Sequence, residues 1–344
     1  MNMNKKKVCI IYTGGTIGMV NTKNGFAPKK GYLPEVLSQI DDLYNESMPD
    51  WDIIEFEPLL DSSNIAVEQW NQIGHAIADN YRDYDGFVVL HGTDTMAYTA
   101  SALSFMLEGL SKPVVITGSQ IPLSELRSDG RDNLIASVMI AGQGVAREVC
   151  LYFGSRLIRG NCATKSSADG LIAFDSPNYP CLAEAGIEIK YDMPHLMHQK
   201  DDKMNDTEFH LRELKQVSIG VLKIFPGIQF DLFEPIMTEK LKGIVLETFG
   251  AGNIPSTDRS LLHIIEKAFR NGTIVTVCSQ CHSGTVKLGT YETSAALTKA
   301  GAVSGYTMTT EAAVAKLYYL FSCGYTRDKI KELMEENLRG ELLK

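Results

Sequence analysis

Short, continuously apolar runs alternate along the chain with longer segments of helical periodicity. The apolar runs are residues 8–12, 86–91, 113–118, 148–153, 218–225, 243–249 and 273–278. The helical segments are residues 34–45, 66–82, 95–109, 131–142, 257–270, 310–322 and 327–338. A strand that is apolar at every position is buried on both faces, which is typical of a parallel sheet covered by helices. The alternation therefore predicts an α/β fold with largely parallel sheets.

The length of the chain and one polar segment predict two domains. A chain of 344 residues holds roughly two domains of about 150 residues each. The strand and helix pattern is interrupted between Tyr191 and Gln216, where the sequence is polar and charged. We interpret residues 191–216 as a linker between an N-terminal domain, residues 1–190, and a C-terminal domain, residues 217–344.

The net charge, the length of the apolar runs and the cysteines disfavour a nucleic-acid-binding, a membrane-spanning and a secreted protein. Lys and Arg number 33 against 42 Asp and Glu, a net charge of −9, which disfavours binding to nucleic acid. No apolar run approaches the roughly 20 residues that cross a membrane. The seven cysteines are odd in number and widely spaced, which fits a reducing compartment. The apolar run at residues 8–12 is too short for a signal peptide, so we expect a cytoplasmic protein.

Glycines and small hydroxyl residues recur where the expected strands end. The segments are Thr13–Thr16, His91–Thr95, Gly118–Gln120 and Thr248–Asn253. Ligands of parallel sheets bind beyond the carboxyl ends of the strands, where glycine lets backbone N–H groups approach an anion such as a carboxylate. The alternative interpretation is that these residues only cap helices and form tight turns.

Familiar cofactor motifs are absent or incomplete. Neither a dinucleotide-binding G-x-G-x-x-G nor a phosphate-binding P-loop occurs. Residues 278–282 have the C-x-x-C-H spacing of covalent haem attachment, but they follow an expected strand in a chain without an export signal, so a local turn is more natural. No further ligands stand at zinc spacing. A redox dithiol is a further interpretation of Cys278 and Cys281.

Threonine is the nucleophile that the loops suggest. No G-x-S-x-G elbow is present, and a threonine hydroxyl needs a nearby base or cation to lose its proton. Asp94, next to Thr93, is one candidate partner, and Lys165 is a second. A Lys–Asp pair beside a hydroxyl polarises it in a dry pocket. A solvated loop lysine is the alternative interpretation of Lys165.

Four segments together resemble the L-asparaginases, in particular the cytoplasmic bacterial type I branch. They are TGGTIG, HGTDTMAYTASAL, KPVVITGSQIPLSELRSDGRDNL and RGNCATKSSADG. The resemblance extends from about Val8 to the segment NLRGE at residues 337–341. It implies hydrolysis of L-asparagine to L-aspartate and ammonia without a metal or cofactor. It also implies a larger N-terminal α/β domain, a smaller C-terminal domain with a parallel sheet, and a homodimer or homotetramer.

The resemblance implies a role for each matching residue. Thr16 matches the nucleophile of the family, and Thr93, Asp94 and Lys165 match its second triad. The implied reaction is attack of the Thr16 hydroxyl on the side-chain amide, loss of ammonia, and hydrolysis of the β-aspartyl ester. Whether Thr93 or water attacks first instead stays open. Glycine placement points to an oxyanion hole of backbone N–H groups near Gly92 or Gly118.

The resemblance also implies a substrate-binding segment. Asp61, Ser62 and Ser63 match the residues that hold the α-amino and α-carboxylate groups of the substrate, and Asp94 and Thr93 complete that set. The discrimination between asparagine and glutamine depends on one methylene, so it stays open.

One position departs from the family. Type I relatives often carry a tyrosine on the N-terminal loop as proton acceptor for the first threonine, and Phe26 stands at the matching position. Tyr32 or Tyr291 is the candidate replacement. Two other functions are alternatives to an asparaginase. One is the ammonia-generating subunit of a tRNA-dependent amidotransferase, which shares this fold but carries an extra N-terminal domain. The other is a catalytically inactive asparagine sensor, which the Phe26 departure would fit.

Overall fold

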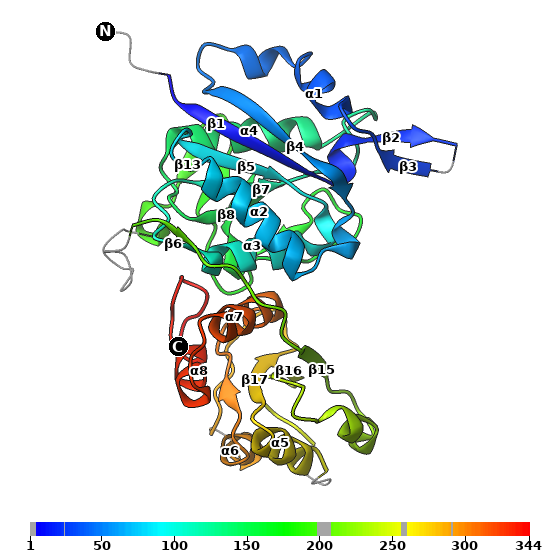
Figure 1. The fold of residues 1–344 in the computed structure, drawn as a ribbon, viewed down its shortest axis with the longest axis vertical. Helices are drawn as coiled ribbons and strands as arrows, with labels where there is room; N and C mark the ends of the chain where they lie inside the picture. The colour runs from blue at the N-terminus through cyan, green and yellow to red at the C-terminus, as the bar shows by residue number, and fades with distance from the viewer. Residues whose placement is uncertain (1–4, 24, 198–207, 256–259, 290–291) are drawn as a thin grey trace. The chain divides into compact units, whose positions relative to one another are not determined.

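The chain forms two units that are divided between Glu213 and Leu214. The computed structural model describes residues 5–23, 25–197, 208–255, 260–289 and 292–344, and Figure 1 shows both units. The division falls inside the expected linker. The limits of the expected domains at residues 190 and 217 stay a prediction.

A mixed sheet of eight strands organises the N-terminal unit. Its strand order is β13-β12-β9-β8-β7-β5-β1-β4. The five parallel strands are β1 (Lys7–Gly14), β4 (Asp50–Leu60), β5 (Gly86–Leu90), β7 (Val114–Thr117) and β8 (Val149–Phe153). The antiparallel strands are β9 (Arg156–Arg159), β12 (Ala183–Ala185) and β13 (Ile189–Tyr191). The parallel part positions the loops of the candidate site.

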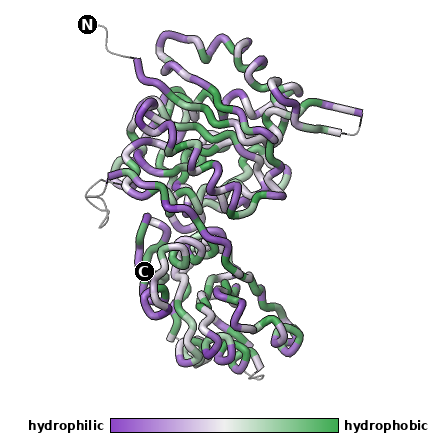
Figure 2. The backbone as a smooth tube through the Cα atoms, viewed as in Figure 1, coloured by the Kyte–Doolittle hydropathy of each residue, from purple (hydrophilic) through white to green (hydrophobic). Residues whose placement is uncertain are grey.

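Helices cover both faces of this sheet. They are α1 (Tyr32–Leu37), α2 (Val67–Asp79), α3 (Met96–Met106) and α4 (Gly130–Gln143). Alternate residues of β1, including Val8 and Ile10, share one core with Leu37 of α1 and Leu134 of α4, and Figure 1 shows α2 and α3 on the other face. Because both faces are covered, the central strands are apolar throughout, as Figure 2 shows.

Three small ribbons complete the N-terminal unit. They are β2 (Met19–Thr22) with β3 (Gly25–Pro28), β6 (Leu107–Glu108) with β14 (His210–Leu211), and β10 (Thr164–Lys165) with β11 (Phe174–Asp175). The first ribbon follows the short 3₁₀ helix η1 (Thr16–Gly18). The third ribbon carries Lys165.

The C-terminal unit has a parallel sheet in the order β15-β16-β17-β18. Its strands are β15 (Ile219–Lys223), β16 (Gly243–Thr248), β17 (Ile274–Ser279) and β18 (Val303–Ser304). Its helices are α5 (Ser260–Arg270), α6 (Glu292–Lys299), α7 (Thr310–Ser322) and α8 (Arg327–Met334). A fully buried ion pair of 2.6 Å joins Lys316 of α7 to Glu341, which also accepts the backbone N–H of Arg339.

The expected α/β fold with two parallel-sheet units is confirmed. All seven expected strands are present, as β1, β5, β7, β8, β15, β16 and β17. The expected helix at residues 34–45 is instead α1 followed by the 3₁₀ helix η2 (Asp41–Tyr44). The pattern missed β4, which lies at the edge of the sheet and carries exposed acidic residues among its apolar ones. None of the described helices is long and apolar enough to cross a bilayer.

Candidate active site

The loops that follow β1, β5 and β7 pack backbone against backbone. These three strands are parallel neighbours, so their carboxyl ends meet at one edge of the sheet. A methyl group at Gly15 would lie 2.5 Å from the backbone N of Gly92, and one at Gly118 would lie 2.3 Å from the carbonyl oxygen of His91. Gly15 also has a φ of 89°. Only glycine has room for such close contacts. The residues that follow these glycines therefore start close together at the sheet edge.

Thr93, Asp94 and Lys165 meet at this edge. Thr93 begins the 3₁₀ helix η4 (Thr93–Thr95) directly after β5, and it is 7% exposed. The Lys165 Nζ donates a hydrogen bond of 3.0 Å to Thr93 Oγ1 and one of 2.7 Å to Asp94 Oδ1. The structure therefore brings three of the expected catalytic residues into one hydrogen-bonded cluster, with the Asp94 carboxylate facing solvent.

Gln120 is a member of this cluster that the sequence reasoning did not select. The Thr93 hydroxyl donates to Gln120 Oε1 at 3.2 Å. The orientation of that amide is fixed because its Nε2 donates to the carbonyl oxygens of Ala168 and Gly170. The Asp129 carboxylate accepts the backbone N–H of Gln120. The available signal was the position of Gln120 in the polar loop after the third parallel strand.

The segment Asp61–Ser63 packs against the Thr93 loop. It follows β4, the neighbour of β1, and the Asp61 carboxylate accepts the backbone N–H of Ser63 at 3.0 Å. The Thr95 hydroxyl donates to the carbonyl oxygen of Ser62 at 2.7 Å. A methyl group at Gly92 would lie 2.5 Å from Ser62 Oγ. The expected substrate-binding segment and the expected catalytic cluster thus lie side by side.

Thr16 stands at the start of η1, immediately after Gly15. Its loop is tied to the loop after β7, because the backbone N–H of Leu123 donates to the carbonyl oxygen of Ile17 at 3.1 Å. The Thr16 side chain is half-buried, and no described residue is hydrogen-bonded to its hydroxyl. Thr16 follows Gly15 and Thr93 follows Gly92, so the contact between the two glycines places the backbones of the two threonines near each other.

No described tyrosine is hydrogen-bonded to the Thr16 hydroxyl. Phe26 lies in the β2–β3 ribbon and is 49% exposed. Tyr32 begins α1, and Tyr291 lies outside the described residues. The hydroxyl of Tyr12 is buried beneath η1, where a methyl group at Gly18 would lie 2.1 Å from it. Burial raises the pKa of Tyr12, so this hydroxyl is a poor proton acceptor.

The C-x-x-C-H segment forms the turn after β17. Gln280 Nε2 donates to the carbonyl oxygens of Ile224 and Glu247, which closes that turn. Cys278 is buried and Cys281 is exposed. Among the residues that the structure describes, no group of three or more His, Cys, Asp and Glu side chains is placed to hold a metal ion.

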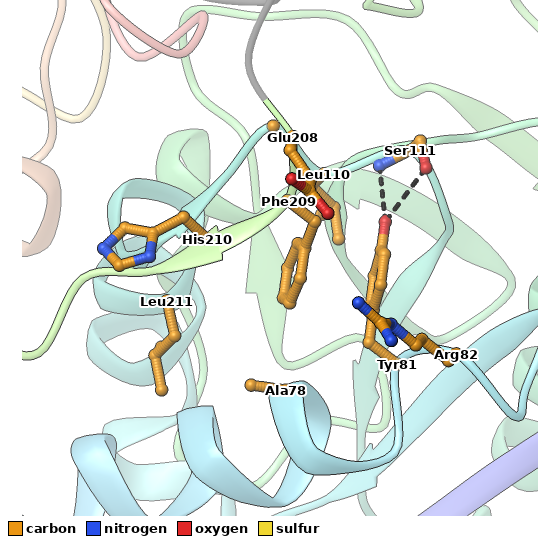
Figure 3. A pocket seen from close by; sticks show the side chains of 10 residues that line it. Ala78, Tyr81, Arg82, Leu110, Ser111, Glu208, Phe209, His210 and Leu211 are labelled. Atoms are coloured by element: carbon orange, nitrogen blue, oxygen red, sulfur yellow. Dashed lines mark hydrogen bonds between the residues drawn. The ribbon is translucent and has the colours of Figure 1, made fainter.

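A cavity of about 550 Å³ lies elsewhere in the N-terminal unit. It is lined by the end of α2, the segment before β7 and the segment around β14, and Figure 3 shows Tyr81 hydrogen-bonded to Ser111 there. The ring of Phe209 stacks on Tyr81 with 3.6 Å between the centroids. None of the expected site residues lines this cavity, so it is separate from the Thr93 cluster.

Comparisons with known proteins identify the family. A family model described as "Asparaginase, N-terminal" matches residues 7–196, and one described as "Glutaminase/Asparaginase C-terminal domain" matches residues 218–334. The chain belongs to the asparaginase family. The resemblance to the type I asparaginases is confirmed, because the chain is 45% identical to L-asparaginase 1 of Escherichia coli K12 over 99% of both chains.

Solved asparaginase structures have the same fold. The crystal structure of L-asparaginase I from Vibrio cholerae matches with a TM-score of 0.90 and 43% identity over 99% of this chain and 100% of that chain. The thermostable L-asparaginase of Thermococcus kodakarensis matches with a TM-score of 0.87 and 31% identity over 98% and 99%. The two-domain asparaginase fold is therefore confirmed over nearly the whole chain.

Proposed function

We propose that this chain hydrolyses L-asparagine to L-aspartate and ammonia, with Thr16 as nucleophile and a Thr93–Lys165–Asp94 triad. The observation that carries the assignment is the Lys165 ammonium, which donates to both Thr93 Oγ1 and Asp94 Oδ1. Membership of the asparaginase family and the 45% identity to an L-asparaginase support the reaction.

The first step makes a covalent intermediate. Thr16 Oγ1 attacks the side-chain amide carbon, the C–N bond breaks, and the threonine proton leaves with the nitrogen as ammonia. The product on the enzyme is a β-aspartyl ester of Thr16. Water then attacks the ester carbon, the bond to Thr16 Oγ1 breaks, and aspartate leaves while the threonine regains its proton.

Thr93 acts on the water of the second step. Thr93 Oγ1 accepts a hydrogen bond from this water and orients it for attack, and the Lys165 ammonium stabilises negative charge that develops on Thr93 Oγ1 while the water proton passes to Thr16 Oγ1. Gln120 holds the Thr93 hydroxyl in one orientation. The Asp94 carboxylate holds the Lys165 ammonium in place through an ion pair of 2.7 Å.

Substrate recognition uses the groups around the cluster. The substrate carries an α-ammonium and an α-carboxylate, so the site needs acidic side chains as well as hydrogen-bond donors. Asp61 and Asp94 supply carboxylates for the ammonium, and the hydroxyl groups of Ser62 and Ser63 are donors for carboxylate oxygens. Thr93 lies beside them, with its hydroxyl donating to Gln120. The contact of Ser62 with Gly92 supports this shared site.

The proposal extends to the state of the protein in the cell. The similarity to type I enzymes supports a cytoplasmic location and a homodimer or homotetramer. No nucleic-acid partner is proposed for a chain with a net charge of −9. Analytical ultracentrifugation of the purified protein tests the assembly, and a monomer would contradict it.

Ammonia release by the purified protein tests the function. We expect turnover of L-asparagine, with L-glutamine measured in parallel over the same concentrations. Thr16→Ala is expected to abolish turnover and to retain asparagine binding in calorimetry. Wild-type turnover in Thr16→Ala would contradict the nucleophile assignment. Binding without turnover by the wild-type protein would favour an asparagine sensor.

A further inference from the structure

His91 is a completely buried residue that the proposed reaction does not use. It directly follows β5 and precedes Gly92 and Thr93, and its backbone N–H donates to the carbonyl oxygen of Thr117 in β7 at 2.9 Å. No substrate reaches a side chain at this depth. Its effect on the site must therefore pass through the groups that it contacts.

The imidazole lies in a chain of hydrogen bonds that runs in one direction. His91 Nδ1 is 2.7 Å from the carbonyl oxygen of Gly92, and His91 Nε2 is 2.9 Å from Thr99 Oγ1. Trp70 Nε1 donates to Thr99 Oγ1 at 3.1 Å. An indole N–H only donates and a carbonyl only accepts, so the proton of the neutral imidazole is on Nδ1. Thr99 then donates to Nε2.

Burial agrees with this assignment. Removal from water lowers the pKa of His91 to about 4, against a smaller opposite effect of the Gly92 carbonyl. The ring is neutral at neutral pH, so it donates at Nδ1 and accepts at Nε2. Both ring nitrogens are then paired, Nδ1 with the Gly92 carbonyl in the loop after β5 and Nε2 with Thr99 of α3.

The Gly92 carbonyl belongs to the peptide plane that carries Thr93. A trans peptide is planar, so a carbonyl that points at the buried imidazole directs the N–H of Thr93 the opposite way. That N–H has no hydrogen-bond partner among the described residues. The orientation of this peptide plane therefore sets the direction of the Thr93 N–H. It also sets the position of the Thr93 Cα atom, from which the hydroxyl group projects.

We propose that His91 is a positioning residue for Thr93, which it holds through the hydrogen bond from Nδ1 to the Gly92 carbonyl. Glycine at position 92 has no Cβ to restrict rotation, because Ser62 occupies the space that a Cβ needs. The imidazole supplies the restraint that the glycine lacks. This inference rests on the proposed role of Thr93 in the reaction.

Two amide variants separate the two sides of the imidazole. In His91→Asn the amide nitrogen overlays Nδ1 and still donates to Gly92, whereas the contact with Thr99 is lost. In His91→Gln the amide oxygen overlays Nε2 and accepts from Thr99, which keeps the Thr99 side and loses the donor to Gly92. We expect kcat for ammonia release to fall about 10-fold to 100-fold in His91→Gln, since small misplacements cost this much. We expect His91→Asn to recover most of that loss.

Two further variants exclude a merely structural role. Thr99→Val breaks the same network and leaves the bond to Gly92, so we expect it to lower the melting temperature as much as His91→Gln with a smaller loss of kcat. Equal kcat in His91→Gln and His91→Asn, or a loss of kcat that tracks melting temperature across all three variants, would overturn the proposal. Thr93→Val is measured beside them. Wild-type kcat in Thr93→Val would overturn the proposed role of Thr93 itself, whereas an inactive Thr93→Val with a fully active His91→Gln overturns only the role of His91.

Discussion

The ammonium group of Lys165 donates a 3.0 Å hydrogen bond to the hydroxyl of Thr93, across 72 positions of the sequence. The same ammonium is paired with Asp94, the neighbour of Thr93. A cation in contact with a hydroxyl stabilises the alkoxide more than the neutral alcohol. The short β10–β11 ribbon thus places the positive charge of Lys165 at the end of β5.

Replacement of Lys165 tests that charge. Lys165→Met keeps the length of the side chain and removes the ammonium, so we expect kcat for ammonia release to fall by about 10²-fold to 10³-fold. Lys190→Met, on exposed β13, is the matched control and keeps wild-type kinetics. A Lys165→Met enzyme with kcat within about 3-fold of wild type would contradict the role of the ammonium.

Gln120 is expected to matter although it carries no charge. Gln120→Met removes the acceptor for the Thr93 hydroxyl and two bonds to the carbonyl oxygens of Ala168 and Gly170. We expect kcat to fall about 10-fold, because the hydroxyl is free to rotate. Steady-state kinetics beside Gln143→Met, an exposed glutamine of α4, measures this effect. Equal kinetics in the two variants would show that Thr93 needs no acceptor.

Gly15, which directly follows β1, is expected to tolerate no side chain. Gly15→Ala introduces a methyl group 2.5 Å from the Gly92 backbone at a φ of 89°. Gly25→Ala is a matched control, since Gly25 also has a positive φ and no atom within 4 Å of its Cβ position. Gly25→Ala should cost only the conformational strain, about 1–2 kcal/mol, whereas Gly15→Ala should also lose activity. Urea unfolding and ammonia release distinguish the two, and an active Gly15→Ala enzyme would refute the close contact.

The buried imidazole predicts a pH dependence of stability. The pKa of His91 is lowered from 6.5 to about 4 in the folded protein, so the unfolded chain binds an extra proton between these values. The free energy of unfolding therefore falls as the pH falls from about 6.5 to about 4, by up to about 3 kcal/mol from this residue. Urea titrations of wild type and His91→Asn measure it. The variant should show a shallower decline over this interval, and parallel curves would contradict the assignment.

Removal of one partner of the buried ion pair between Lys316 and Glu341 is expected to destabilise the protein more than removal of both. Glu341→Leu leaves a buried ammonium without its carboxylate, which costs about 3–5 kcal/mol of unfolding free energy. The double variant Lys316→Met with Glu341→Leu removes both charges and should regain a large part of that loss. Urea unfolding of the wild type and the two variants measures the difference. A double variant as unstable as Glu341→Leu would show that the ammonium is not the source of the cost.

The parallel strands β5, β7 and β8 could be predicted because they are buried at every position and almost wholly apolar. β4 was missed because it is an edge strand, where exposed acidic residues such as Asp52 and Glu57 interrupt the apolar pattern. That omission mattered for the site, since β4 delivers Asp61–Ser63 to the Thr93 loop. The antiparallel strands β12 and β13, of three residues each, are too short to give a periodic signal.

Thr16, Thr93, Asp94 and Lys165 could be selected from motifs, but their contacts could not. Lys165 is brought to Thr93 by the β10–β11 ribbon, whose two-residue strands carry no sequence pattern. Gln120 was visible as a polar residue after a strand, yet its bond to Thr93 depends on which strands are neighbours in the sheet. Strand order is a tertiary property that hydrophobic periodicity does not encode.

The hydrogen bond from Trp70 gives the protein an optical reporter. The chain has two tryptophans, and the indole of Trp51 donates to the carbonyl oxygen of Leu43, outside the Thr93 network. In a Trp51→Phe protein the remaining emitter is the buried Trp70, which is connected to the Gly92 peptide through Thr99 and His91. Indole fluorescence then follows the packing behind the site during turnover, without a dye and without a coupled assay.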